Sequence, residues 1–256
     1  MRQNTQHEAR NAPVADPLRV YTRADELPAP FEAGALLVDK PQGLTSFGVV
    51  RRLRRALGVK KVGHAGTLDP MATGLLIVLV GRQATREQDR FMGLPKTYTG
   101  TIRLGETTAT YDAESPVEGH SDASGVTDAA LEAARRRFLG EILQRPPAYS
   151  AIKRGGERLY AKARRGEDVE VAPRPVTVYE LELTARRGAD VDFRVVCSKG
   201  FYVRSLAHDF GEALGVGGHL TALRRTAIGP FRVEEAFPLA ALAGEKGGEG
   251  ERGKGG

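Results

Sequence analysis

The sequence contains a single cysteine, Cys197, among its 256 residues. One cysteine excludes an intramolecular disulfide and a cysteine-rich zinc site, and it favours a reducing compartment. The N-terminal stretch MRQNTQHEARNAPVADP lacks the apolar segment of a secretory signal peptide. The longest apolar run, residues 75–80, is far too short to cross a bilayer. We therefore expect a soluble, cytoplasmic protein that makes no contact with a membrane.

The chain is rich enough in apolar residues for a sizeable core, and it carries an excess of positive charge. Its composition is 41% hydrophobic and its formal net charge is +6. This excess favours a polyanionic partner. Residues 1–30 are polar and rich in proline and alanine, which predicts a flexible leader. Residues 244–256 contain only Gly, Glu, Lys and Arg, which predicts a disordered tail and leaves residues 31–243 as the folded domain.

Strand and helix patterns alternate irregularly along this domain. Short apolar or alternating runs predict strands at residues 34–40, 74–81, 96–105 and 191–200. Helical spacing of apolar residues predicts helices at residues 45–58, from Thr127 onward, and at residues 201–215. The lack of a regular β-α-β rhythm disfavours a Rossmann-type fold. It predicts an α+β fold with a mixed, largely antiparallel sheet.

The helix predicted at residues 45–58 has Ser46 as its expected N-cap and Gly58 at its C-terminal end. Its apolar face consists of Val49, Val50, Leu53, Ala56 and Leu57. Its opposite face consists of Arg51, Arg52, Arg54 and Arg55. This basic face adds to the case for a polyanionic partner.

The segment GHAGTLDPMATGLLIVLVG, residues 63–81, places one carboxylate, Asp69, just before a buried strand. One interpretation is an Asx-turn in TLDP, stiffened by Pro70. The other is a catalytic carboxylate in a glycine-rich loop that a ligand approaches closely. A phosphate-binding loop is excluded, because the chain has no G-x-x-x-x-G-K-[ST] motif. His64 fits a substrate contact or a structural role better than a metal site, since no cluster of His or Cys accompanies it.

A second segment, CSKGFYVRSLAHDFG at residues 197–211, gathers Lys199, Tyr202 and Arg204 where a strand turns into a helix. One interpretation is a solvated turn. The other is that Arg204 pairs with a buried acid and keeps it ionised and oriented. A buried carboxylate needs such a partner. An ion pair between Asp69 and Arg204 would therefore account for the presence of both residues.

Basic and aromatic residues interleave in RPPAYSAIKRGGERLYAKARRG, residues 145–166. Tyr149 and Tyr160 suit stacking on bases, and the cations around them suit phosphate contacts. The cations expected to contact an RNA backbone are Lys153, Arg154, Arg158, Lys162, Arg164 and Arg165. The stretch is too rich in Gly, Pro and charge for a core segment. We therefore favour nucleic-acid binding over an ordinary solvated face.

In this order along the chain, the segments resemble the bacterial tRNA pseudouridine synthases of the TruB type, which act on the uridine at position 55 of the tRNA T loop. The resemblance covers about residues 34–238 and is carried by DKPQGLTSFGVVRRLRR, KVGHAGTLDPMATGLL, KTYTGTIRLG, RPPAYSAIKRGGERLYAKARRGE, CSKGFYVRSLAHDFG and LTALRRTAIGPF. It implies the pseudouridine synthase fold, a central sheet flanked by helices and loops, with a basic RNA-binding insertion at about residues 145–175. The chain departs from the family's pattern at Ala65, where threonine is common, and at Ala109, where many members have aspartate.

The resemblance also implies roles for individual residues. Asp69, in G-H-x-G-x-L-D-P, matches the nucleophile, and Arg204 matches the arginine that pairs with it. Tyr98 would stack on the flipped uracil. The residues expected to contact the substrate, line its pocket or lie close to it are His64, Tyr202, Leu223 and Lys40.

The implied reaction detaches uracil, rotates it and rejoins it through C5, with no metal or cofactor. Asp69 either attacks the sugar C1′ or adds to C6 of the base, and both routes stay open. We expect a monomer that binds the T arm and elbow of tRNA, lacks the family's C-terminal PUA domain and needs no protein partner. The alternatives are a non-catalytic tRNA-binding or folding factor on the same scaffold and a glycosidase-like hydrolase, which normally uses two carboxylates.

Overall fold

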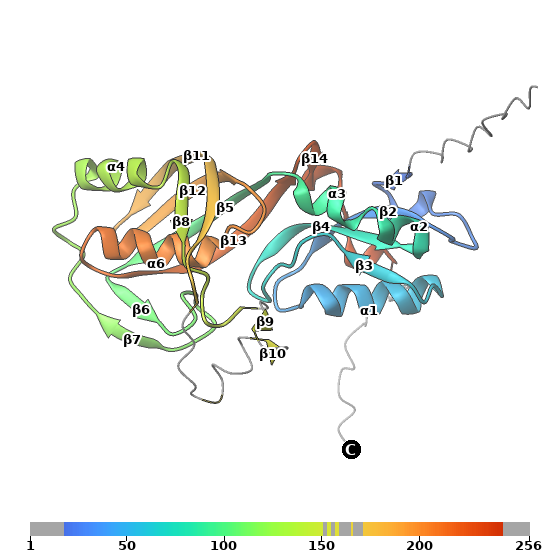
Figure 1. Ribbon diagram of the computed structural model, residues 1–256, viewed down its shortest axis with the longest axis horizontal. Coiled ribbons are helices and arrows are strands. Elements are labelled where there is room, and N and C mark those ends of the chain that lie inside the picture. The colour runs from blue at the N-terminus through green and yellow to red at the C-terminus, as the bar shows by residue number, and fades with distance from the viewer. Residues whose placement is uncertain (1–17, 151–152, 155–156, 159–164, 166–170, 243–256) are drawn as a thin grey trace, which may run out of the picture.

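The structure, a computed structural model, describes residues 18–150, 153–154, 157–158, 165 and 171–242. In this part of the chain an 11-stranded sheet runs from one end of the elongated molecule to the other (Figure 1). Its main path, in spatial order, is β1 (Val20–Tyr21), β2 (Gly34–Lys40), β4 (Thr73–Val80), β13 (Gly218–Ile228), β5 (Lys96–Leu104), β12 (Asp190–Cys197), β11 (Arg174–Arg187) and β8 (Gly140–Gln144). Three short strands pair beside this path: β3 (Val62–His64), β14 (Phe231–Arg232) and β15 (Phe237–Pro238).

Antiparallel pairing dominates this sheet. On the main path only β1–β2 and β4–β13 are parallel. Two hairpins stand apart from it: β6 (Glu106–Thr108) with β7 (Val117–His120), and β9 (Lys153–Arg154) with β10 (Glu157–Arg158). The predicted α+β fold with a mixed, largely antiparallel sheet is confirmed.

One half of the sheet, formed by β2 and β4, is covered on both faces. The covering helices are α1 (Ser46–Leu57), α2 (Gly81–Arg86) and α3 (Gln88–Gly93). Successive side chains of a strand point to opposite faces. Leu36 and Leu76 therefore pack in the cluster with α1, whereas Leu37 and Leu75 pack in the cluster with α2 and α3. Both faces of the strand predicted at residues 74–81 are therefore buried.

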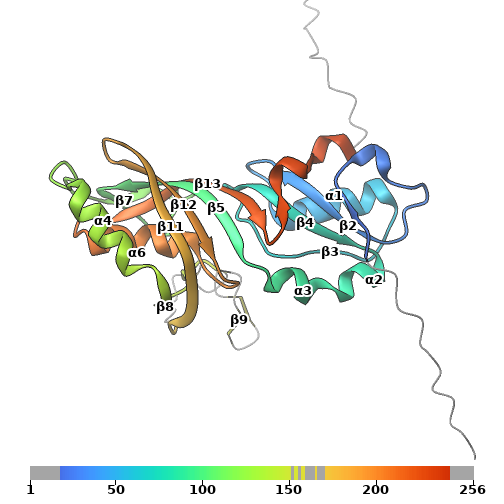
Figure 2. The same ribbon diagram turned by 90° about the horizontal axis from the view of Figure 1, so that it is seen from above.

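The other half of the sheet is covered by α4 (Asp128–Arg137) and α6 (Val203–Ala213), which pack with β5, β11, β12 and β13 in one hydrophobic cluster. Figure 2 shows both helices beside the long strands β11 and β12. The inward-facing residues of β12 are those that alternation predicts: Val191, Phe193, Val195 and Cys197. Leu206 and Phe210 of α6 meet them in the same core.

The start of α1 differs by one residue from the prediction. Thr45, not Ser46, is the N-cap, and its side chain accepts the Gly48 N–H at 2.9 Å. Ser46 is the first helical residue, which leaves its hydroxyl for a tertiary contact. Gly58 ends the helix with φ +66°, as predicted, but Ala56 lies exposed rather than in the apolar face.

The two halves of the sheet join where β4 meets β13. These strands pair at two positions, Arg224 with Thr73 and Arg225 with Gly74. Gly74 has φ +102°, and a Cβ at this position would lie 2.3 Å from the Arg225 carbonyl oxygen. Only glycine permits two backbones to approach this closely.

The N-terminal boundary of the fold differs from the prediction. Strand β1 lies inside the segment 1–30 expected to be a flexible leader, and its Tyr21 is buried. A strand of two residues has no detectable periodicity, and its existence depends on the edge of β2. The predicted tail at residues 244–256 lies outside the described residues. Within the described ranges, no helix is long and apolar enough to span a membrane.

The thiol of Cys197 supplies a test of this core. Burial raises its pKa to about 12. Because the thiolate is the reactive form, we expect the native protein at about pH 8 to react with a thiol reagent only as fast as it unfolds. The protein in urea should react at once. The contribution of this thiol to stability is complete below its ordinary pKa of 9.0 and is lost as the pH rises through about 12. Rapid labelling of the native protein would contradict the burial.

Candidate active site

A cleft of about 790 Å³ opens at the junction of the two sheet halves. Five predicted site residues line it, although they come from distant parts of the chain: Asp69, Tyr98, Tyr202, Arg204 and Leu223. The lining also includes residues that the sequence did not assign to the catalytic site: Lys96, Asp112, Glu114, Tyr149 and Arg225.

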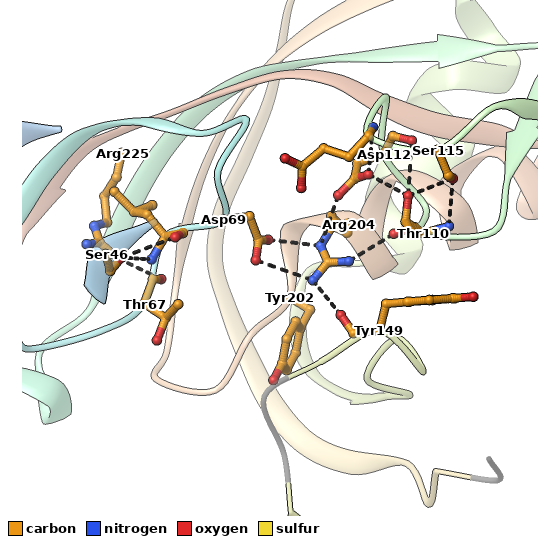
Figure 3. Close-up of polar contacts among 12 residues, drawn as sticks. Ser46, Thr67, Asp69, Thr110, Asp112, Ser115, Tyr149, Tyr202, Arg204 and Arg225 are labelled. Carbon is orange, nitrogen blue, oxygen red and sulfur yellow. Dashed lines mark hydrogen bonds and ion pairs between the residues drawn. The ribbon is translucent and has the colours of Figure 1, made fainter. Parts of the chain in front are cut away.

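Asp69 and Arg204 form an ion pair at the centre of the cleft (Figure 3). Nε of Arg204 lies 2.9 Å from Oδ2 of Asp69 without hydrogen-bond alignment, and Nη2 donates to Oδ1 at 3.5 Å. The Arg204 side chain is 7% exposed, whereas that of Asp69 is 34% exposed. The acid is therefore less buried than the sequence suggested. Arg204 holds it from the protein side, and the rest of the carboxylate is open to the cleft.

Arg204 also holds a second carboxylate. Its Nε lies 3.5 Å from Oδ2 of Asp112, whose side chain is 1% exposed. Its Nη1 and Nη2 donate to the carbonyl oxygens of Thr110 and Tyr149, each at 3.0 Å. Asp112 further accepts hydrogen bonds from the Thr110 hydroxyl at 2.6 Å and from the Glu114 N–H at 3.0 Å. One guanidinium thus compensates two acids and fixes the loop that faces Asp69 (Figure 3).

Glu114 is a third acid near this ion pair. Burial and the neighbouring carboxylates of Asp112 and Asp69 raise the pKa of Glu114, and Arg204 opposes this rise. The TATYDAES stretch that contains Asp112 and Glu114 offers only one signal in the sequence: its acids cluster after a predicted strand. Nothing in that spacing indicates that they reach Arg204.

The loop that carries Asp69 is closed by its backbone, since Ala72 N–H donates to the Asp69 carbonyl oxygen at 3.1 Å. The carboxylate itself faces Arg204, which favours the catalytic interpretation over the Asx-turn. The hydroxyl of Ser46 binds both backbone groups of Leu68, accepting from N at 2.8 Å and donating to O at 3.1 Å. The first turn of α1 therefore anchors the loop directly before Asp69.

Three buried cations hold the backbone beside the cleft. Lys40 donates to the carbonyl oxygens of Leu44 at 2.6 Å and Pro70 at 3.3 Å. Lys96 donates to that of Leu94 at 2.7 Å, and Arg225 to that of Gly66 at 3.1 Å. Burial lowers the pKa of both lysines to about 8. These contacts give Lys40 a supporting position outside the cleft lining.

Tyr98 and Leu223 form one wall of the cleft from neighbouring strands. Both are nearly buried, and β5 pairs with β13 so that Leu223 lies opposite Gly100. Burial raises the pKa of the Tyr98 hydroxyl, and the nearby Arg225 guanidinium opposes that rise. Such a wall suits an inserted aromatic base.

Tyr202 is anchored by the Gln144 side chain, which accepts its N–H at 2.7 Å and donates to its carbonyl oxygen at 3.0 Å. The Arg174 guanidinium lies 5.1 Å from the centre of the Tyr202 ring. Arg174 was not predicted as a site residue, because nothing in the sequence pattern indicates that this residue of β11 reaches the Tyr202 ring. Together the two residues form part of the cleft lining.

His64 ends β3 and is not among the residues that line the cleft. Its ring is partly buried, and burial together with the Arg225 charge lowers its pKa. Within the described ranges, no three His, Cys, Asp or Glu side chains gather as metal ligands would. His64 therefore lies close to Arg225 but outside the cleft lining, and within the described ranges it belongs to no metal-binding cluster.

The basic insertion is described only in part. Lys162, Arg164 and Tyr160 lie outside the described residues. The backbones of Lys153, Arg154 and Arg158 form the β9–β10 hairpin, and Arg165 is exposed. Figure 1 shows this hairpin below the junction of the sheet halves.

Comparison with known proteins gives the family. Residues 54–203 match the model of the TruB family pseudouridylate synthase (N terminal domain), and residues 204–247 match that of the tRNA pseudouridylate synthase B C-terminal domain. The chain is 54% identical over 219 residues to tRNA pseudouridine synthase B of Arthrobacter sp. (strain FB24), which covers 83% of this chain and 71% of the relative. It is 52% identical over 220 residues to the protein of the same name from Thermobifida fusca (strain YX), covering 83% and 75%.

A solved structure is also similar, namely that of a Cbf5-Nop10-Gar1 complex. The match has a TM-score of 0.63 and 35% identity, and it covers 80% of this chain. This chain spans about half of that protein, 52% of its length. The pseudouridine synthase fold expected from the sequence is thereby confirmed. The chain belongs to the TruB family of pseudouridylate synthases.

Proposed function

We propose that this chain isomerises uridine in tRNA to pseudouridine, that its target is uridine 55 of the T loop, and that Asp69 is the nucleophile. The family and the relatives named tRNA pseudouridine synthase B support the reaction and the substrate class. The observation that supports Asp69 as the nucleophile is the position of its carboxylate. Arg204 holds it on one side, and 34% of the Asp69 side chain stays exposed.

The chemistry needs only what this cleft offers. The N1–C1′ bond breaks, the C5–C1′ bond forms, C5 loses a proton and N1 gains one, so the base is neither oxidised nor reduced. Asp69 supplies an electron pair either to C1′ or to C6. Arg204 orients its carboxylate. The uridine has to leave its stack to reach Asp69, and the wall of Tyr98 and Leu223 receives the extruded base.

The remaining predicted residues take supporting roles in this proposal. Tyr202, at the start of α6, contacts the substrate from the cleft lining. Lys40 positions the loops around Pro70 and Leu44. His64 contacts the RNA beside the cleft. The cations of about residues 145–175 bind the T arm and elbow, and the enzyme acts as a cytoplasmic monomer without an obligate protein partner.

Tritium release from a tRNA transcript labelled at uracil C5 tests this proposal. We expect one equivalent of tritium to be released per tRNA, and no tritium to be released when the T-loop uridine 55 is replaced by cytidine. Release that persists with the cytidine-bearing tRNA would place the target elsewhere. Tight tRNA binding with no release from either transcript would overturn the catalytic function in favour of a tRNA-binding or folding factor.

A further inference from the structure

Helix α1 presents four exposed arginines: Arg51, Arg52, Arg54 and Arg55. The helix contains no Asp or Glu, and none of the four forms an ion pair within the described part of the chain. Among the described residues, their one side-chain hydrogen bond runs from Arg54 to the Val62 carbonyl oxygen at 3.4 Å. The positive charge continues beyond the helix at the exposed Lys60 and Lys61.

Elsewhere in this protein, surface arginines are commonly paired with acids. Arg135 and Arg136 both contact Glu132 on α4. Arg103 contacts Asp190, and similar pairs join Arg187 to Asp192 and Arg194 to Glu180 across the sheet. Other exposed arginines of the described surface, such as Arg82, Arg86 and Arg137, also lack an acidic partner, but α1 gathers four of them on one helix that contains no acid.

The spacing on α1 also sets like charges against each other. Arg51 lies three and four residues before Arg54 and Arg55, so these side chains are neighbours on the helix surface. Like charges at such spacing destabilise a helix. A bound polyanion would remove this repulsion, whereas water and salt only screen it.

Helix α1 begins at the catalytic loop. Its first residue, Ser46, binds the backbone of Leu68, the neighbour of Asp69. A helix of 12 residues is about 18 Å long. Figure 1 shows α1 along the lower edge of the molecule, starting near the junction of the two sheet halves. Its exposed face therefore continues from the rim of the cleft.

Phe47, in the first turn of α1, is 60% exposed. It precedes Arg51 by four residues, so the two side chains lie on the same side of the helix. An exposed aromatic ring next to cations is the arrangement that binds unpaired nucleotides, by stacking and by phosphate contacts. A helix surface that was merely solvated would gain nothing from this ring.

We propose that Phe47 and the arginine face of α1 bind the substrate RNA beside the cleft. An unpaired nucleotide stacks on Phe47, and backbone phosphates contact Arg51, Arg54 and Arg55. The inference rests on the proposed function, because the RNA is the one whose uridine enters the cleft. It assigns a second RNA-contacting surface, distinct from the insertion at about residues 145–175.

The test compares two double variants that remove the same charge. Arg51→Gln with Arg55→Gln alters α1. Arg82→Gln with Arg86→Gln alters exposed arginines on α2, which covers the opposite face of the sheet. Glutamine keeps helix propensity close to that of arginine. The dissociation constant of a tRNA transcript is measured over a range of salt concentrations, together with kcat/KM from tritium release.

We expect the α1 variant to bind about 10-fold more weakly at moderate salt and to lose about one or two units of the slope of log K against log salt. The kcat/KM of the α1 variant should fall by about the same factor as its affinity for tRNA. Phe47→Ala should weaken binding with an unchanged salt slope, and the α2 variant should match the wild type. Equal losses in both double variants, or no loss in the α1 variant, would overturn the inference. A wild type that binds tRNA but releases no tritium would instead defeat the proposed function, and the binding comparison would still decide the role of α1.

Discussion

Asp69→Asn should lower the rate of tritium release by about 10⁴-fold or more while leaving the affinity for tRNA within about threefold. The amide has nearly the shape of the carboxylate, so Arg204 keeps an oxygen to contact near the present 2.9 Å position. An amide oxygen, however, is a poor nucleophile at either C1′ or C6. The measurement is single-turnover tritium release, with binding followed separately.

Asp89→Asn is the matched control, because Asp89 is an exposed residue of α3 and the change in charge is the same. It should release tritium at the wild-type rate. Asp69→Asn with near-normal release would show that Asp69 is not the nucleophile. A loss of tRNA binding in proportion to the loss of rate would show that Asp69 acts in binding instead.

Arg204→Met should lower the free energy of unfolding by about 3–5 kcal/mol. It should also slow isomerisation by at least about 100-fold. The guanidinium is almost fully buried and compensates both Asp69 and Asp112. Its removal leaves Asp112 charged, buried and without a counter-ion, and it releases the Thr110 and Tyr149 carbonyls. Urea unfolding measures the first effect and tritium release the second.

The double variant Arg204→Met/Asp112→Asn separates these effects. A neutral amide at position 112 needs no counter-ion, so about half of the lost stability should return. Activity should stay low, because Asp69 still lacks the group that orients it. If Arg204→Met unfolds at the wild-type urea concentration, or if Asp112→Asn restores nothing, the ion-pair account of this cleft is wrong.

Strong periodicity made much of the fold predictable. The alternating run at residues 191–200 and the helical spacing at residues 201–215 predicted β12 and α6, whose Phe193 and Phe210 are buried. The N-cap of α1 was wrong by one position because Thr45 and Ser46 both suit a cap, and only packing against Leu68 decides between them. Strand β1 was missed because its two residues depend on the edge of β2.

Site residues were predictable where a side chain, by its chemical type, requires a partner of opposite charge. A carboxylate near a buried strand requires a cation, and this need connects Asp69 with Arg204. Lys96 and Arg225 create no such signal, because the carbonyl oxygens that they bind become available only when the loops near Leu94 and Gly66 have folded. Asp112 was missed for the same reason, since its partner lies on α6.

Arg204 and Asp69 stand 135 positions apart, and β13 occupies the middle of the sheet between β4 and β5. During synthesis the ribosome releases β4 and β5 long before the strand that separates them. Contacts between such distant segments form late. The nascent chain therefore has no cleft until residues up to 228, the end of β13, have left the exit tunnel. A prematurely terminated product that lacks β13 has no cleft and no partial activity, so only molecules synthesised past β13 contribute to this modification in the cell.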